Sequence, residues 1–124
     1  MPKRVLNVGN CSLDHDAIRR LIEDNFDADI VAAQGTDDAL EALRRAPFDL
    51  VLANRKFAPS AALGIDLIRQ MKSDPQLGTT PVMLVSNYPD AQQEAVAAGA
   101  EPGFGKAELD REETRQKLAR FLGP

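Results

Sequence analysis

The segment Phe48-Asp49-Leu50-Val51-Leu52-Ala53-Asn54 decides the fold of this chain. Four consecutive apolar residues, Leu50 to Ala53, follow a turn at Pro47 and predict a strand that is buried on both faces. Such strands are typical of parallel sheets covered by helices, in which ligands bind beyond the carboxyl ends of the strands. Asn54 stands at that end, so the chemistry of a site there depends on a neutral amide.

On both sides of this strand, short apolar runs alternate with segments of helical periodicity. Further strands are predicted at residues 3–8, 30–33, 82–85 and 103–105. Helices are predicted from Asp14 to about Asn25, after Thr36, from Gly64 to Asp74, from Pro89 to Gly99 and from Asp110 to the end of the chain. Five strand and helix units in this order predict an α/β fold, a doubly wound five-stranded parallel sheet with helices on both faces.

Local signals predict where individual helices begin. Thr36 is the expected N-cap of the second helix, because Asp37 and Asp38 follow in its first turn. Asp110, with Glu113 three residues later, predicts a capping box at the start of the last helix. Residues 55–63, which include Pro59, are expected to form a loop.

Composition limits the class of protein. The 124 residues are 44% hydrophobic and 27% charged, which predicts one soluble globular domain over residues 1–124. No apolar run is long enough for a membrane span or a signal peptide, so we expect a cytoplasmic protein without membrane contact. The net charge is −4 and the basic residues are dispersed among acids, which argues against direct nucleic-acid binding.

The pattern as a whole resembles the receiver domains of bacterial two-component response regulators. The residues that carry the resemblance are Ala39-Leu40, the segment 48–52, Gly64, Pro81-Val82, Ala98-Gly99-Ala100 and Lys106. The resemblance implies that Gly9 and Asn10 stand where the family has an acidic pair, and Asn54 where it has the phosphorylated aspartate. Ser86 and Lys106 match the family's hydroxyl residue and lysine. The chain would then be a degenerate receiver, one that lacks the phosphorylated aspartate and the acidic pair.

These departures have chemical consequences. A carboxamide oxygen is a far weaker nucleophile than a carboxylate, so Asn54 is not expected to accept a phosphoryl group. Magnesium requires carboxylate ligands, and Gly9, Asn10 and Asn54 offer none. We therefore expect no catalytic residue, no metal site, no cofactor, and weak or absent magnesium binding.

The switch residues of the family also differ here. The resemblance places the family's mobile aromatic residue at Gly103, whereas the adjacent Phe104 is expected in the core because successive strand side chains face opposite sides. The family's Lys-Pro pair becomes Lys106-Ala107, for which a trans peptide bond is expected.

Other candidate residues have two interpretations each. Lys106 and Ser86 could bind an anion, but we favour structural remnants that hydrogen-bond Asn54. His15 is expected at a solvated surface position. Cys11 lacks the arginine six residues later that a phosphatase-type phosphate loop would need, because Ala17 occupies that position. Asp14 or Asp16 could replace the missing acids, although both lie in the first helix, where the geometry is unfavourable.

The sequence predicts a contact surface around the fourth helix. Tyr88 precedes this helix, and the uncharged Gln92 and Gln93 lie within it, a composition found at interface cores. The resemblance adds the fifth strand and fifth helix to this face, with Gly103, Glu108 and Arg111. We expect a phosphorylation-independent interaction module of a phosphorelay, whose partner is a histidine kinase, a response regulator or an output protein.

Two alternatives remain open. One is a phosphorylatable or anion-sensing receiver that uses a non-standard acid. The other is a flavodoxin-like cofactor-binding protein, in which the loop Gly9 to Ser12 would hold the phosphate group, although this loop lacks a glycine-rich fingerprint.

Overall fold

The computed structural model describes residues 2–57 and 62–123. Met1, Pro124 and residues 58–61 lie outside this part, and so does the predicted loop position of Pro59. Within the described residues, no helix has the length and apolar character needed to cross a membrane.

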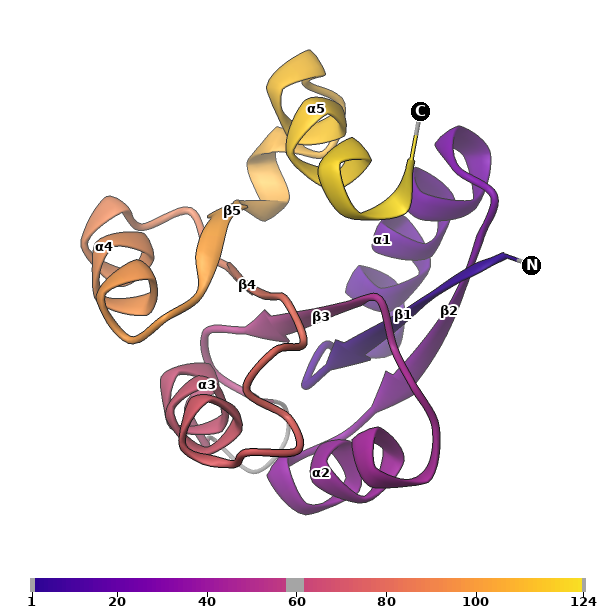
Figure 1. Cartoon of the computed structure of the whole chain (residues 1–124). Coiled ribbons are helices and arrows are strands. Elements are labelled where there is room, and N and C mark those ends of the chain that lie inside the picture. The colour runs from indigo at the N-terminus through magenta and orange to yellow at the C-terminus, as the bar shows by residue number, and fades with distance from the viewer. Residues whose placement is uncertain (1, 58–61, 124) are drawn as a thin grey trace.

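Strands and helices alternate along the chain (Figure 1). The strands are β1 (Lys3–Val8), β2 (Ala28–Ala33), β3 (Leu50–Asn54), β4 (Val82–Val85) and β5 (Glu101–Phe104). The helices are α1 (Ser12–Asn25), α2 (Thr36–Arg45), α3 (Gly64–Ser73), α4 (Pro89–Ala97), the short 3-10 helix η1 (Lys106–Glu108) and α5 (Glu112–Leu122).

The five strands form one parallel sheet, as the sequence predicted, and their order in the sheet is β2-β1-β3-β4-β5. The strand order reverses between β1 and β3, since β2 lies outside β1 while β4 and β5 continue beyond β3. In sheets of this kind the crevice at the reversal, beyond the strand ends, is the usual ligand site. Asn54, the last residue of β3, lies at this crevice.

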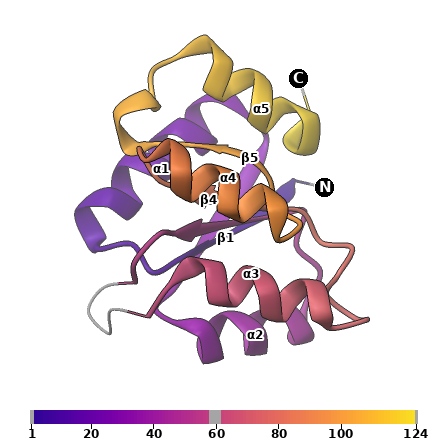
Figure 2. The ribbon, with the colours of Figure 1, turned by 90° about the vertical axis from the view of Figure 1, so that its left-hand side faces the viewer.

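Helices cover both faces of the sheet (Figure 2). Helices α1 and α5 lie on one face and α2 and α3 on the other, while α4 lies beside β4 and β5. Alternate strand residues fill the two cores: Leu6, Val51 and Leu84 pack toward α2, α3 and α4, whereas Leu50 and Leu52 pack toward α1 and α5. The predicted burial of Leu50 to Ala53 is confirmed, because all four residues are fully buried.

Three predicted boundaries in the N-terminal half are wrong by one or two residues. Helix α1 begins at Ser12 rather than at Asp14, and β2 begins at Ala28 because its pairing with β1 starts there, with Lys3 opposite. Gly35 is the N-cap of α2 and Thr36 is already helical, with no side-chain cap bond. Backbone pairing, which local propensity does not specify, decided the strand boundary.

The predictions for the C-terminal quarter also need correction. Strand β5 covers Glu101–Phe104 instead of residues 103–105, because Glu101 pairs with Met83 and Phe104 with Val85. Pro102 is tolerated because β5 is an edge strand.

The capping box expected at Asp110 is absent. Helix α5 begins at Glu112, with Arg111 as an N-cap that makes no side-chain cap bond. Instead, the Thr114 hydroxyl donates to the Glu108 carbonyl at 2.7 Å and ties the first turn of α5 to η1. The expected burial of Phe104 is confirmed. Helix α4 ends at Ala97 with Ala98 as its C-cap, so the predicted end at Gly99 is two residues too late, and Gly99 follows the cap with a positive φ of 110°.

Candidate functional site

The carboxyl ends of β1, β3, β4 and β5 bring the predicted site residues to one edge of the sheet. Asn54 ends β3, Gly9 and Asn10 follow β1, Ser86 follows β4, and Lys106 follows β5 after one residue. The Asn54 amide donates to the Gly9 carbonyl at 3.1 Å and to the Lys56 carbonyl at 2.8 Å. Both of its N–H groups are therefore used to join the loops after β1 and β3.

Gly9 is required by its surroundings. It has φ of +78°, in the left-handed region that favours glycine, and a Cβ there would overlap the ring of Phe57. Phe57 is almost fully buried, and it fills the space beside Gly9 in the first of the two cores. An acidic side chain at this position would displace that ring, so the packing of Phe57 against Gly9 leaves no room for one.

Asn10 belongs to an amide chain that sequence reasoning missed. Its Nδ2 donates to Oδ1 of Asn7 at 2.7 Å, and Nδ2 of Asn7 lies 3.0 Å from Nδ1 of His15. Asn7 is 1% exposed, and Oδ1 of Asn10 is buried with no hydrogen-bond partner among the described residues. The predicted solvated position of His15 is therefore wrong, because its ring is half-buried and accepts from Asn7.

Lys106 does not hydrogen-bond Asn54, contrary to the favoured prediction. Its ammonium donates to Oδ2 of Asp14 at 2.8 Å. Both side chains are about one third exposed, and the hydrogen bond from Lys106 is the main reason that the pKa of Asp14 lies below its usual range. Asp14 thus reaches the strand-end site from α1. Asp16 does not, because its carboxylate lies on the helix surface, 3.7 Å from the guanidinium of Arg19.

Ser86 is also bonded elsewhere. Its hydroxyl oxygen accepts from the backbone N–H of Tyr88 at 3.1 Å and so shapes the entry to α4. Tyr88 is 59% exposed, and the guanidinium of Arg55 lies over its ring at 4.9 Å. Such a cation over an aromatic face is an attractive contact, and it holds Arg55 at the mouth of the strand-end site.

The side chain of Gln92 inserts from α4 between β4 and β5. Its Nε2 donates to the carbonyls of Leu84 at 2.8 Å and Ser86 at 3.1 Å, and its Oε1 accepts from the Gly103 N–H at 3.1 Å. The strand register shifts between Met83 and Val85, so these backbone groups lack regular partners in the sheet. Gln92 therefore completes the sheet at this edge, and we call these contacts the Gln92 clamp.

The clamp requires glycine at position 103. A Cβ on Gly103 would overlap the Leu84 carbonyl and would lie 3.0 Å from Oε1 of Gln92. The position at which the resemblance placed a mobile aromatic residue is thus filled by hydrogen bonds between α4 and the sheet.

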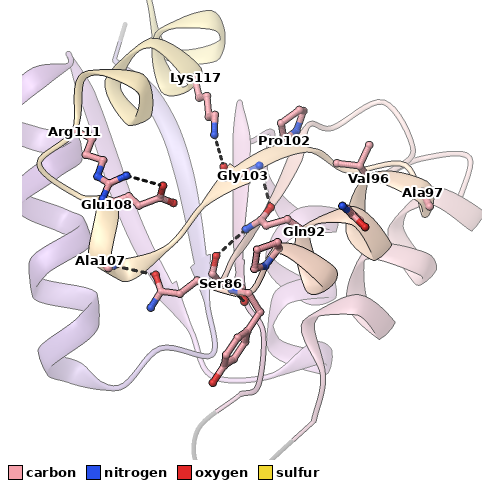
Figure 3. A pocket seen from close by; sticks show the side chains of 14 residues that line it. Ser86, Gln92, Val96, Ala97, Pro102, Gly103, Ala107, Glu108, Arg111 and Lys117 are labelled. Carbon is pink, nitrogen blue, oxygen red and sulfur yellow. Dashed lines mark hydrogen bonds and ion pairs between the residues drawn. The ribbon is translucent and has the colours of Figure 1, made fainter.

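A groove of about 740 Å3 lies between α4, β5 and α5 (Figure 3). It contains all six residues of the predicted contact surface: Tyr88, Gln92, Gln93, Gly103, Glu108 and Arg111. Apolar side chains form much of its wall, including Val96, which is 44% exposed.

Polar contacts hold the α5 side of this groove in place. Lys117, which sequence reasoning missed, donates to the Gly103 carbonyl at 2.9 Å. The Glu108 carboxylate accepts from the Gly105 N–H at 2.8 Å, and one of its oxygens lies 3.5 Å from the guanidinium of Arg111. Glu108 and Arg111 therefore neutralise each other, whereas Lys117 keeps its charge beside a backbone carbonyl.

A second, smaller hollow of about 250 Å3 lies directly at the strand ends. Its lining residues are Asn54, Arg55, Lys56, Val85, Ser86, Asn87, Tyr88 and Lys106. None of these carries a carboxylate. Across the described residues, no group of three or more His, Cys, Asp or Glu side chains is placed to hold a metal ion.

Comparisons with known proteins concern the fold. No protein-family model matches this chain. A solved structure from Chloroflexus aurantiacus, described as a response regulator, matches with a TM-score of 0.86 and 15% identity over 100% of both chains. The signal receiver domain of a DNA-binding response regulator from Colwellia psychrerythraea matches with a TM-score of 0.81 and 22% identity, covering 98% of this chain and 99% of that one. A response regulator from Thermotoga maritima matches with a TM-score of 0.79 and 21% identity over 100% of both chains. Over nearly its whole length, this chain therefore has the flavodoxin-like fold of response regulator receiver domains.

Proposed function

We propose that this chain is a degenerate receiver domain that acts in two-component signalling through protein contacts, without phosphorylation of Asn54. The observation that carries the proposal is the state of Asn54 itself. It occupies the carboxyl end of β3, yet its amide N–H groups are both bound to backbone carbonyls. A carboxamide in this arrangement is a poor nucleophile toward phosphorus.

The surroundings of Asn54 support the same proposal. Phosphoryl transfer depends on a magnesium ion that neutralises charge on the phosphoryl oxygens, and magnesium is held by carboxylates. Three of the residues that line the hollow at the strand ends are cationic, namely Arg55, Lys56 and Lys106. Their charge repels a divalent cation, so we propose that magnesium binds weakly and that the domain has no enzymatic activity or resident cofactor.

The Gln92 clamp supports independence from a phosphorylation signal at the contact face. The resemblance to receivers implies a switch in which an aromatic side chain on β5 changes position. Here the Gln92 side chain binds backbone groups of both strands, and Gly103 leaves no side chain that could change position. We therefore propose that the groove between α4, β5 and α5 is present in its binding form at all times.

The proposed partner is another signalling protein, either a histidine kinase, a response regulator or an output protein. The groove offers the exposed Tyr88 and Val96 beside small residues such as Ala97 and Ala107, and exposed apolar surface of this kind marks interaction sites.

The first test asks whether the strand-end site can bind magnesium and a mimic of an aspartyl phosphate. Labelled protein is titrated with magnesium and then with beryllofluoride, and amide shifts near Asn54, Ser86 and Lys106 are followed by NMR. We expect these amides to stay still. Magnesium-dependent, saturable shifts would contradict the proposal, since they would require an acid that completes the phosphorylation site.

The second test concerns the contact face. Purified histidine kinases and response regulators from the source organism are tested for binding to the wild-type chain and to Val96→Asp, which places a charge in the groove. The matched control is Leu13→Asp, because Leu13 is 78% exposed on α1, away from the groove. Loss of binding in Val96→Asp alone supports the face, whereas equal binding by both variants contradicts it.

A further inference from the structure

The two edges of the sheet differ in how they are protected against pairing with another strand. At β5, Pro102 has no N–H to offer. Side chains bind both backbone groups of Gly103, Gln92 at its N–H and Lys117 at its carbonyl. At the opposite edge, β2 contains no proline and no lysine, and its register with β1 continues without a bulge. Strand β2 therefore lacks the features that usually prevent strand pairing at a sheet edge.

The backbone of β2 has unpaired groups along its outer side. The carbonyls of Asp27 and Ala33, at the two ends of the strand, accept backbone N–H bonds from the β1 side at 3.0 and 2.8 Å. Because the backbone groups of successive strand residues point to opposite sides, those of Ile30 and Ala32 point away from β1. Among the described residues, no side chain or loop hydrogen-bonds the backbone of either one.

Exposed apolar side chains accompany these free backbone groups. Val31 is 40% exposed although it lies within a strand, and Ala32 beside it is also exposed. Ala28, at the start of β2, is buried. The open part of the edge is therefore the segment 30–32, which presents apolar side chains together with backbone donors and acceptors. Only another strand satisfies both at once.

From this arrangement we propose that the outer edge of β2 pairs with β2 of a second copy of this chain. The two strands run antiparallel, with the two-fold axis through Val31. Ile30 then lies opposite Ala32 of the second copy, and the two residues exchange N–H and carbonyl bonds. The two Val31 side chains face each other in the non-hydrogen-bonded pair, where side chains approach most closely.

Charge and size favour this register and a second copy as the occupant. The bulky Ile30 meets the small Ala32 twice, because the same strand is used on both sides of the axis. Asp29 is the only charged residue of β2, and in this register it lies opposite Ala33. An axis through Asp29 would place two carboxylates opposite each other, and an axis through Ile30 would place Val31 against Asp29. Like charges directly opposite destabilise strand pairing, which matters in a chain whose net charge is −4.

This inference goes beyond the proposed function and does not depend on it. The groove between α4, β5 and α5 lies at the other edge of the sheet from β2 (Figure 1). Pairing through β2 therefore leaves the groove of each copy free for its partner. A chain that does not pair can still bind through the groove, and loss of groove binding leaves the pairing of β2 unaffected.

The first experiment is sedimentation velocity of the whole chain from micromolar to millimolar concentration. We expect a reversible monomer–dimer equilibrium. Val31→Lys places two ammonium groups together on the two-fold axis and removes the apolar pair, so its dissociation constant should rise about fivefold to tenfold. The matched control is Leu13→Lys, because Leu13 is exposed on α1, away from β2, and the variant should dimerise like the wild-type chain.

Disulfide trapping tests the register. In a Cys11→Ser background, which removes the free thiol, Val31→Cys should form a disulfide-linked dimer on mild oxidation. The Cα atoms of a non-hydrogen-bonded pair lie about 4.5 Å apart, within the range that a disulfide spans. Asp29→Cys in the same background should remain unlinked, because the two residues 29 lie roughly 13 Å apart in this register. Equal linking of the two variants overturns the register.

Hydrogen exchange tests the strand pairing directly. The amides of Ile30 and Ala32 should exchange more slowly at concentrations where the dimer forms than at concentrations where the chain is monomeric. A monomer at every concentration overturns the proposal and leaves the edge to a strand of another protein. A dimer with unchanged exchange at these amides, or one weakened by Leu13→Lys or Val96→Lys rather than by Val31→Lys, overturns it in favour of a different face.

Discussion

The backbone N–H of Gly103 on β5 donates to Oε1 of Gln92 on α4 across 3.1 Å, so one side chain of a helix takes the place of a strand neighbour. The Nε2 atom of the same Gln92 side chain donates to the backbone carbonyls of Leu84 and Ser86, at the end of β4. A helix that is hydrogen-bonded to the sheet at three backbone groups cannot shift without breaking all three. The following predictions rest on this contact and on others at the strand ends.

Replacing Gln92 by leucine keeps the approximate side-chain size but removes every hydrogen bond of the clamp. We expect a loss of about 1–3 kcal/mol in the free energy of unfolding, because the backbone groups of Leu84 and Gly103 are left without partners. Denaturant unfolding measures the loss, and hydrogen exchange should show faster exchange of α4 amides. Gln93→Leu is the control, since its side chain is exposed on the same helix. Equal effects of the two variants would show that the clamp does not hold α4.

Gly9→Ala should destabilise the chain by about 3 kcal/mol, because strain at positive φ adds to the overlap with Phe57. Gly123→Ala separates the two causes. Gly123 also has a positive φ, of 88°, but an added Cβ there meets no atom within 4 Å. Its variant should lose only about 1–2 kcal/mol. Similar losses, measured by thermal or denaturant unfolding, would argue against a steric role for Phe57.

The Asp14 and Lys106 pair should give stability a specific pH dependence. The hydrogen bond from Lys106 keeps the pKa of Asp14 below the ordinary value of 3.8. A depressed pKa stabilises the folded chain above that value, and this stabilisation is lost as the pH falls through the lower, folded pKa. Both side chains are about one third exposed, so the contribution should be less than about 1 kcal/mol.

Unfolding measured between about pH 2 and pH 6 tests this dependence. Asp14→Asn should have a flatter profile than the wild-type chain below about pH 4. Asp16→Asn, whose carboxylate lies on the α1 surface near Arg19, should keep the wild-type slope. An unchanged slope in Asp14→Asn would contradict the assignment of the pH dependence to this pair.

Restoring two carboxylates should restore a cation site. In the double variant Asn10→Asp with Asn54→Asp, both acids lie beyond the carboxyl ends of β1 and β3, where magnesium is expected to bind. We expect saturable, magnesium-dependent NMR shifts in this variant and none in the wild-type chain. Beryllofluoride should then shift the amides of Ser86 and Lys106 as well. No magnesium response in the double variant would show that the loops, rather than the missing acids, exclude the cation.

Several features of the fold could be predicted because they depend on local pattern. The apolar run from Leu50 to Ala53 specified a strand buried on both faces, and alternation of strands with helices specified the parallel sheet. Phe104 could be placed in the core from strand alternation alone. The boundaries of β2 and β5 could not, because they depend on pairing with β1 and β4.

The candidate site was predicted in composition but not in its contacts. The strand ends bring Asn54, Ser86 and Lys106 to one edge, as expected for parallel strands. The sequence offered no signal that Lys106 would bond to Asp14, which is 92 residues away along the chain. The buried Asn7 could have been noticed as a polar residue within an apolar strand, a pattern that usually marks a hydrogen-bonded network.

By itself, the sequence determined the class of fold and the chemistry available at the strand ends, because periodicity and side-chain identity are properties of single residues and their neighbours. That Asn54 lacks a carboxylate needs no structure to establish. Only the tertiary structure decided which groups meet: Asp14 with Lys106, Gln92 with Gly103, and Asn7 with His15. These contacts join residues on different elements, and their geometry depends on how the helices pack on the sheet rather than on any local preference of the chain.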